Sequence, residues 1–328
     1  MSQVQSDVLT GGGPSGAAPI GEVSKEIIGR SPWELFWRRF RRDRFALAGL
    51  VIVGIMIVLA LGAPLISKWV GHGPNQVVLT QLDSFGLPRG PHAGYWFGVD
   101  QAGRDLMVRV IYGARTSLFI AFFATGMATV LGVIMGMLAG FYRGKIDTFI
   151  SRTIDVVLSL PVLLLALGLV AACGLSKEGC LGGLISPGLL LVSYVIGLFS
   201  WPYIARIVRG QVLSLREKEF VEAARSMGSS NLRIMFREIL PNVAAPIIVY
   251  TTLIIPNNIL FEAALSFLGV GVPQTTPSWG RQLSDAGAIF TVAWWMMVFP
   301  GLFLFTTTLA FNLVGDGLRD SLDPRMGG

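Results

Sequence analysis

Two carboxylates lie inside long apolar stretches of this sequence, where an ionisable side chain is costly to bury and usually faces protein or water. Asp155 follows Arg152 by about one helical turn near the end of its stretch, and this spacing predicts a local ion pair. Glu262 lies deeper, in NNILFEAALSFLG. It could line a solute pathway, hydrogen-bond a neighbouring helix or lie near the outer headgroups, and we favour the structural roles.

The sequence lacks the usual catalytic and metal-binding patterns. His72 and His92 share one hydrophilic stretch, and neither HExxH nor a paired CxxC is present. The string nearest to a Walker A motif, residues 140–146, is one residue short between its glycines and lacks Ser or Thr after the lysine. GxSxG is also absent. We therefore expect no catalytic residue, metal or cofactor in this chain, and the intramembrane hydrolase class has no plausible catalytic group.

Two cysteines, Cys173 and Cys180, lie close together at the end of one apolar stretch. Their spacing permits a disulfide in an oxidising compartment. Two lone thiols fit the composition of a membrane protein as well, so the bridge stays open and we favour free thiols.

Residues 219–241, EFVEAARSMGSSNLRIMFREILP, form a charged segment between two apolar stretches and predict two short amphipathic helices. Gly228 would end the first helix in the left-handed conformation, Ser229 or Ser230 would cap the second, and Pro241 would interrupt it. Each helix has one face for water and one for either a protein groove or lipid headgroups. The first stripe is Phe220, Ala223, Ala224 and Met227, beside Glu217, Glu219, Glu222 and Arg225; the second is Leu232, Met235, Phe236 and Ile239.

Composition places these elements in a membrane. Hydrophobic residues make up 52% of the 328, charged residues only 14%, and the mean hydropathy is +0.63. A soluble domain carries about 25% charged residues, so the sequence predicts an all-α polytopic membrane protein in contact with lipid. The net charge of +6 does not indicate nucleic acid, because the basic residues cluster at the ends of apolar stretches and form no basic groove with interleaved aromatics.

Six transmembrane helices of about 20 residues are predicted. Residues 1–30 read as a disordered tail, 31–44 as a basic amphipathic helix at the inner surface, and 68–115 as an external loop. The other five helices form a core over 116–315 with a cytoplasmic loop at 205–241, followed by a cytoplasmic tail at 316–328. The six helices are expected at 45–67, 116–140, 149–172, 184–204, 243–268 and 289–314.

Arginine and lysine counts give the orientation. With the N-terminus inside, 19 of the 26 basic residues fall in inner segments and 7 in outer ones. Cytoplasmic loops carry this excess, so both termini and the charged segment 219–241 are predicted on the cytoplasmic side.

Small residues and prolines mark the predicted spans. Gly132, Gly136 and Gly140 form two GxxxG steps, a smooth strip that lets another helix approach closely, either within the chain or from a partner subunit. Prolines within spans predict kinks or broken turns, which suit a transport path. These are Pro161, Pro202, Pro246, Pro256 and Pro300.

Three ordered motifs resemble those of bacterial ABC importer permeases of the dipeptide/oligopeptide family, and more narrowly their C-type subunit. Segment 222–241 is similar to the EAA loop, with Glu222, Ala223, Ala224 and Gly228 matching and ILP as its ending. Segment 98–118 resembles a second signature, with valine at 99 in place of the usual threonine, and FEAALSFLGVGV…PSWG, which includes Glu262, resembles a third. The matching residues of the second are Gly98, Asp100, Gly103, Arg104 and Asp105.

This resemblance, over about residues 30–324, implies a type I importer permease in a bacterial plasma membrane. Its partners would be a second, homologous permease, two ATPase subunits that bind ATP and Mg, and an external solute-binding protein. The helix around Glu222, with Phe220 and Met227, would be the coupling helix seated on an ATPase. Uptake of di- or oligopeptides is the implied function, but no residue can be assigned to the solute.

A secondary transporter driven by an ion gradient is the alternative. That class favours internal repeats and ionisable residues at the membrane midplane. The two halves of this chain show no obvious repeat, and only Glu262 is a deep candidate.

Overall fold

The computed structural model describes residues 32–175, 185 and 187–322. The tail predicted at 1–30, the end of the chain and Cys180, with the disulfide considered for it, lie outside the described residues. The longest helices are α2 (Arg44–Val70), α3 (Leu106–Tyr142), α6 (Leu189–Leu215), α9 (Leu240–Phe267) and α11 (Trp295–Leu322). The shorter elements are α1 (Pro32–Phe40), η1 (Leu79–Gln81), α4 (Gly144–Ser159), α5 (Val162–Leu175), α7 (Glu219–Ser226), α8 (Asn231–Arg233), η2 (Ile234–Ile239) and α10 (Trp279–Ala286).

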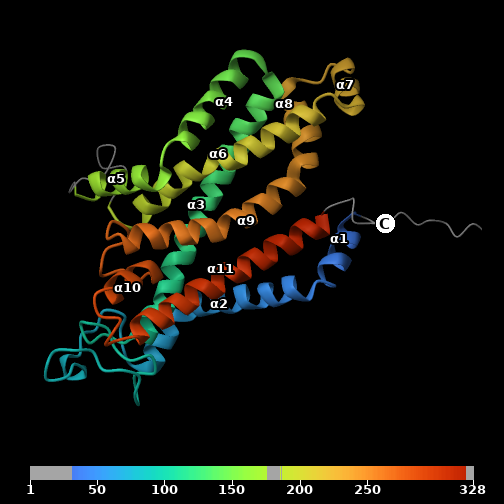
Figure 1. Ribbon diagram of the computed structural model, residues 1–328. Helices are drawn as coiled ribbons and strands as arrows, with labels where there is room; N and C mark the ends of the chain where they lie inside the picture. Colours follow the sequence, from blue (N-terminus) through green and yellow to red (C-terminus); the bar gives the residue numbers. More distant parts are fainter. Residues whose placement is uncertain (1–31, 176–184, 186, 323–328) are drawn as a thin grey trace, which may run out of the picture.

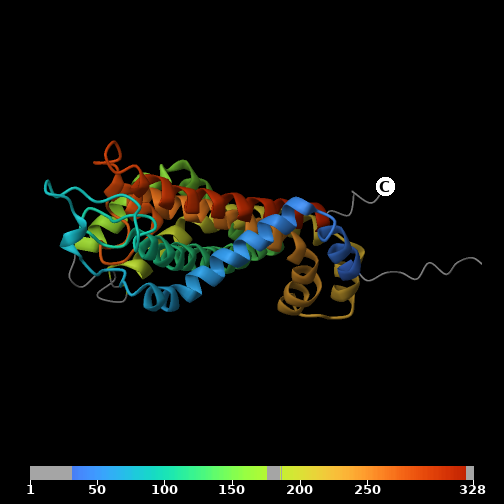
Figure 2. The ribbon, with the colours of Figure 1, turned by 90° about the horizontal axis from the view of Figure 1, so that it is seen from below.

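The long helices run beside one another and separate the polar connections into two ends (Figure 1). The loop between α2 and α3 lies at one end, whereas α1, α7 and the last turn of α11 lie at the other, in both views (Figure 2). The predicted all-α class is confirmed. Within the described residues, five helical segments are long and apolar enough to cross a membrane, or six if α4 and α5 count as one bent span.

Aspartate caps fix where two of these spans begin. Asp43 precedes α2, and its Oδ1 accepts hydrogen bonds from the amides of Phe45 and Ala46 at 2.9 and 3.1 Å. Asp105 does the same for α3, which therefore starts about ten residues before the predicted span at 116–140. The loop between α2 and α3 is correspondingly shorter than the 68–115 expected for it, because Gly71 ends α2 at φ +82° and α3 already begins at Leu106.

The break predicted at Pro161 divides the span expected at 149–172. The chain forms α4 and α5 there, bent by 86° around residues 160 and 161. Pro161 lacks the amide hydrogen that would continue α4, so the helical ladder stops and restarts in a new direction. Pro202, Pro246, Pro256 and Pro300, by contrast, lie inside helices that continue past them.

The glycine strip of α3 packs within the chain, against α6. A Cβ on any of these glycines would lie 2.7 Å from the Cβ of an α6 side chain, so only glycine allows this approach. The internal alternative for the strip is therefore the one that the structure supports. The facing pairs are Gly132 with Ile204, Gly136 with Val208 and Gly140 with Val212.

The predicted pair of Asp155 with Arg152 is also wrong. Asp155 of α4 lies 2.9 Å from Arg206 of α6 instead. About two turns earlier on α4, Asp147 forms a two-pronged contact with Arg209 at 2.5 and 2.9 Å. Helical spacing predicts neighbours on the same helix, but here a second helix brings the better-placed guanidinium.

Candidate functional site

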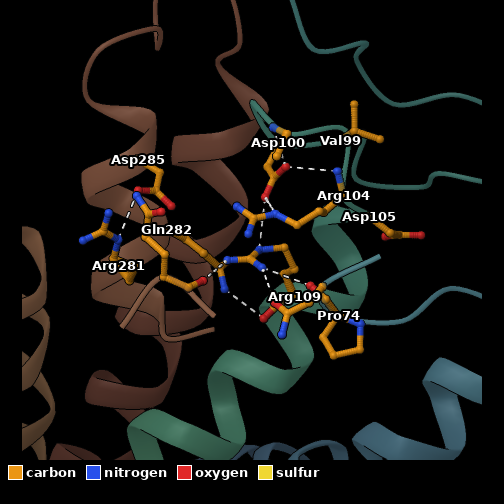
Figure 3. Close-up of polar contacts among 12 residues, drawn as sticks. Pro74, Val99, Asp100, Arg104, Asp105, Arg109, Arg281, Gln282 and Asp285 are labelled. Atoms are coloured by element: carbon orange, nitrogen blue, oxygen red, sulfur yellow. Dashed lines mark hydrogen bonds and ion pairs between the residues drawn. The ribbon is translucent and has the colours of Figure 1, made fainter. Parts of the chain in front are cut away.

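A buried ion-pair network lies under the loop between α2 and α3 (Figure 3). Oδ2 of Asp100 is 2.7 Å from Nε of Arg104 and 3.2 Å from Nε of Arg109, while its Oδ1 accepts the amide hydrogens of Ala102 and Arg104. The Asp100 and Arg109 side chains are only 5% and 1% exposed. Buried charges are tolerated when they are paired and hydrogen-bonded, and both conditions are met here.

Arg109, in the first turn of α3, joins segments that are distant in sequence. Its guanidinium donates to the carbonyl of Pro74 at 3.0 Å, to Oδ1 of Asn75 at 3.2 Å and to the carbonyl of Gln274 at 3.4 Å. Its own carbonyl accepts from Nε2 of Gln282 on α10 at 2.8 Å. Sequence reasoning missed this residue; its signal was a lone arginine one turn after the helix cap, at the head of an apolar stretch.

The other motif residues of this loop have structural roles. Asp105 caps α3 and its Oδ2 lies 2.7 Å from Nδ1 of His72. Gly98 and Gly103 adopt φ of +74° and +72°, and a Cβ on Gly103 would lie 2.5 Å from the carbonyl oxygen of Val78. Gly98, Asp100, Gly103, Arg104 and Asp105 are thus brought together in one rigid corner.

Glu262 is fully buried on α9 and hydrogen-bonded to a neighbouring helix. Its carboxylate accepts from Ser117 of α3 at 2.9 Å and from Ser266 of α9 at 2.7 Å. The second of the three roles considered for Glu262 is therefore the one observed. In the described part of the chain no three His, Cys, Asp or Glu side chains gather as a metal site would require.

The charged hairpin, defined as residues 219–241, forms at the end of the molecule opposite the loop (Figure 1). The first helix is confirmed as α7, Gly228 follows it at φ +78°, and Ser230 caps the next turn by accepting from the amide of Arg233. The prediction of a short second helix is wrong. It runs from α8 through the π-helical η2 into α9, and this wider turn carries the chain past Pro241.

The hairpin leaves an apolar surface uncovered. Val221 and Ala224 pack inward with Met235 and Ile239, in the same core as the α3–α6 contact. Of the predicted first stripe only Ala224 is buried, whereas Phe220 and Ala223 are exposed and Met227 is 79% exposed. The exposed large apolar side chains of the hairpin are Phe220, Met227, Leu232 and Phe236. A group of this kind marks a surface that contacts either a protein partner or a membrane.

Arginines hold the base of the hairpin to the corner between α3 and α4. Arg143 pairs with Glu217, Arg216 donates to the carbonyl of Phe141, and Arg225 lies 5.6 Å from the Phe141 ring centre. The hydrogen bond and charge of Arg143 lower the pKa of Glu217, while partial burial, followed by the charges of Arg143 and Arg225, lowers the pKa of Arg216. A cavity of about 630 Å³ is lined by Arg143, Arg216, Glu217, Glu222, Arg225 and Ser226.

Comparison with known proteins decides the family. A model described as the binding-protein-dependent transport system inner membrane component matches residues 132–328, and one described as the N-terminal TM domain of oligopeptide transport permease C matches residues 31–83. The chain belongs to the family of binding-protein-dependent transport inner membrane components. It is a multi-pass membrane protein and a transport component rather than an enzyme.

Two curated relatives resemble this inner membrane component over nearly its whole length. The dipeptide transport system permease protein DppC of Alkalihalophilus pseudofirmus is 40% identical over 298 residues, 90% of this chain and 91% of the relative. The glutathione transport system permease protein GsiD of Escherichia coli is 40% identical over 299 residues, 91% and 92% of the two chains. A chain of the inward-facing MetNI methionine ABC transporter shares the fold, with a TM-score of 0.54, 20% identity and coverage of 66% and 96%.

Proposed function

We propose that this chain is one of two permease subunits of an ATP-binding cassette importer that takes up peptides across a bacterial plasma membrane. The observation that carries the proposal is the hairpin, which presents uncovered apolar side chains while its inner face is built into the α3–α6 core. The names of the dipeptide and glutathione relatives support a peptide or peptide-like solute.

The proposed topology has six crossings with both termini in the cytoplasm. The bent pair α4–α5 counts as one crossing, since α4 starts at the hairpin end and α5 finishes at the loop end (Figure 1). An even number of crossings agrees with the position of α1 and the end of α11 beside the hairpin, and the excess of inner basic residues assigns that end to the cytoplasm.

The partners follow from this orientation. A second, homologous permease completes the pathway, and a solute-binding protein docks on the outer loop. Two ATPase subunits, which bind ATP and Mg, sit under the hairpins. Glu222 and Gly228 place α7 for this contact, with Phe220, Ala223 and Met227 on its open face. ATP-driven closure of the ATPases pushes α7, and its packing with η2 carries the push into the spans.

The test is reconstitution of the complete transporter in proteoliposomes. Met227→Asp should abolish ATPase association and ATP-driven uptake without reducing folded yield, because the side chain is 79% exposed in the free chain. Phe85→Asp is the matched control for ATPase association, since Phe85 is 87% exposed at the opposite end. Normal ATPase association by Met227→Asp contradicts the proposed interface, and uptake driven by an ion gradient without ATP establishes a secondary transporter instead.

Two glycines that follow helix ends provide a second matched pair of variants. Gly228 and Gly71 both end helices at positive φ, +78° and +82°, with no atom near the added methyl group. Alanine therefore imposes a similar backbone strain at each position. Gly228→Ala should weaken ATPase association while Gly71→Ala leaves it unchanged; equal effects would indicate only a loss of stability.

A further inference from the structure

A cavity of about 700 Å³ opens between α5, α6 and α9, at the level where these helices carry their prolines. Its volume lies in the range of small-molecule sites. Among the described residues that line it, none is charged. The polar lining side chains are Ser200, Tyr203, Tyr250, Asn257 and Asn258.

Each wall of the cavity carries a proline beside it. Val162, Tyr203 and Asn257 line it, and each directly follows a proline, at positions 161, 202 and 256. Proline supplies no amide hydrogen to the carbonyl four residues earlier, so the helical ladder is locally broken. In a membrane protein such irregular backbone is tolerated where it is buried or lines a polar cavity. One helix break and two missing ladder hydrogen bonds beside one cavity therefore indicate a site in contact with something other than lipid.

The polar groups fall into two sets. Ser200 of α6 donates to Oδ1 of Asn258 on α9 at 2.8 Å, and Asn258 donates to Oγ1 of Thr125 on α3 at 2.8 Å. These two hydrogen bonds therefore join the three helices to one another. In the described part of the chain the hydroxyls of Tyr203 and Tyr250 have no hydrogen-bond partner, and these residues are 53% and 37% exposed. Asn257 uses only one amide hydrogen, toward the carbonyl of Leu253.

We propose that this cavity is where the passing solute contacts this subunit, and that it receives an uncharged, amide-bearing stretch of a peptide. The inference rests on the proposed import function. Phenol hydroxyls and a carboxamide can both donate to and accept from peptide amides. Lipid hydrocarbon offers these groups no hydrogen bonds, which makes lipid the unfavourable occupant. The absence of a fixed charge leaves each contact weak enough for the solute to move on.

The first experiment measures ATP-driven uptake of radiolabelled dialanine and glutathione by the complete transporter in proteoliposomes. Tyr203→Phe and Tyr250→Phe should each lower kcat/KM for uptake about five-fold, the effect of one lost neutral hydrogen bond. Tyr194→Phe is the matched control, because this exposed tyrosine lies on α6 outside the cavity. Assembly with the ATPases should be unchanged in all three.

The outcomes separate the two proposals. If the wild-type transporter takes up neither peptide with ATP, the import proposal fails. If the wild type is active and both cavity variants match Tyr194→Phe, the cavity proposal is overturned while import stands.

Photocross-linking provides a readout that does not depend on rate. With p-benzoylphenylalanine in place of Tyr203, irradiation during turnover should attach radiolabelled dialanine, and excess unlabelled dialanine should suppress the adduct. The same replacement at Phe305, exposed on α11 outside the cavity, should give no adduct. Capture of lipid or of the partner permease alone at position 203 overturns the proposal.

Discussion

At the scale of residues, the buried polar groups of this transport component bond across segments that are far apart in sequence. Arg109 binds carbonyls 35 and 165 residues away, and Glu262 binds a serine 145 residues away. Such partners are set by how helices and loops meet in three dimensions. The motif residues could be found in the sequence, but Arg109 and Gln282 could not be assigned a role, because no local pattern links them.

Arg109 should be far more important for stability than an exposed arginine. Arg109→Leu leaves the buried Asp100 with one partner fewer and removes the hydrogen bonds to the carbonyls of Pro74 and Gln274, which should cost about 3–5 kcal/mol. Arg206→Leu breaks an ion pair that is more than half exposed, so its cost should be about 1 kcal/mol or less. Thermal unfolding of the two variants in detergent measures the difference, and equal melting temperatures would contradict the role of Arg109.

Two glycines of the outer loop provide a second comparison. Gly103→Ala places a methyl group 2.5 Å from a backbone carbonyl oxygen, whereas Gly86→Ala, at a similar φ, places it in open space. Both variants carry strain of about 1–2 kcal/mol from positive φ. Only Gly103→Ala should also loosen the loop, which limited proteolysis of residues 71–105 would show as faster cleavage than in Gly86→Ala.

At the scale of elements, the sequence located all the long helices but not where they end or how sharply they bend. Hydropathy reports where apolar residues lie, so it placed the spans and missed the first ten residues of α3, which lie outside the predicted span. Proline indicated a break at 161, but the 86° angle depends on what α4 and α5 pack against. The short α10 is too brief for a periodic pattern to reveal it.

The contact between α3 and α6 gives an element-scale prediction. Gly136→Leu forces a side chain into a space where even a Cβ lies 2.7 Å from Val208, so the helices must separate. Gly126→Leu adds the same side chain to the same helix with no atom within 4 Å. We expect Gly136→Leu to lower the free energy of unfolding by about 1–3 kcal/mol or more and to reduce the folded yield. Gly126→Leu should change neither quantity. Similar unfolding temperatures would be evidence against close α3–α6 packing.

The base of the hairpin should loosen in acid. The pKa of Glu217 is lowered in the folded chain, so its contact with Arg143 is present above the unfolded pKa, about 4.3, and is lost as pH falls through the lower folded pKa. A spin label at Ser226→Cys should therefore become more mobile below about pH 4. In a Glu217→Gln background the label should be mobile at every pH; a pH response there would point to another group.

At the scale of the whole molecule, the two polar ends should face opposite sides of the membrane. Phe85→Cys at the loop end should react with a membrane-impermeant maleimide in intact cells. Met227→Cys at the hairpin end should react only after permeabilisation, with the wild-type chain as the background control. Reaction of the two positions in the opposite order would invert the proposed orientation.

One continuous helix, α3, spans these two ends. Its 37 residues run from the Asp105 cap, below the loop between α2 and α3, to the Arg143 cap beside the hairpin. At 1.5 Å per residue this is a rod of about 55 Å. Inserting one residue in the middle of α3 would turn one end of the helix by about 100° relative to the other. Either Arg109 or the glycine strip would then lose its partners. The length of α3 is therefore as constrained as its composition, and relatives should tolerate insertions in their loops but not in this helix.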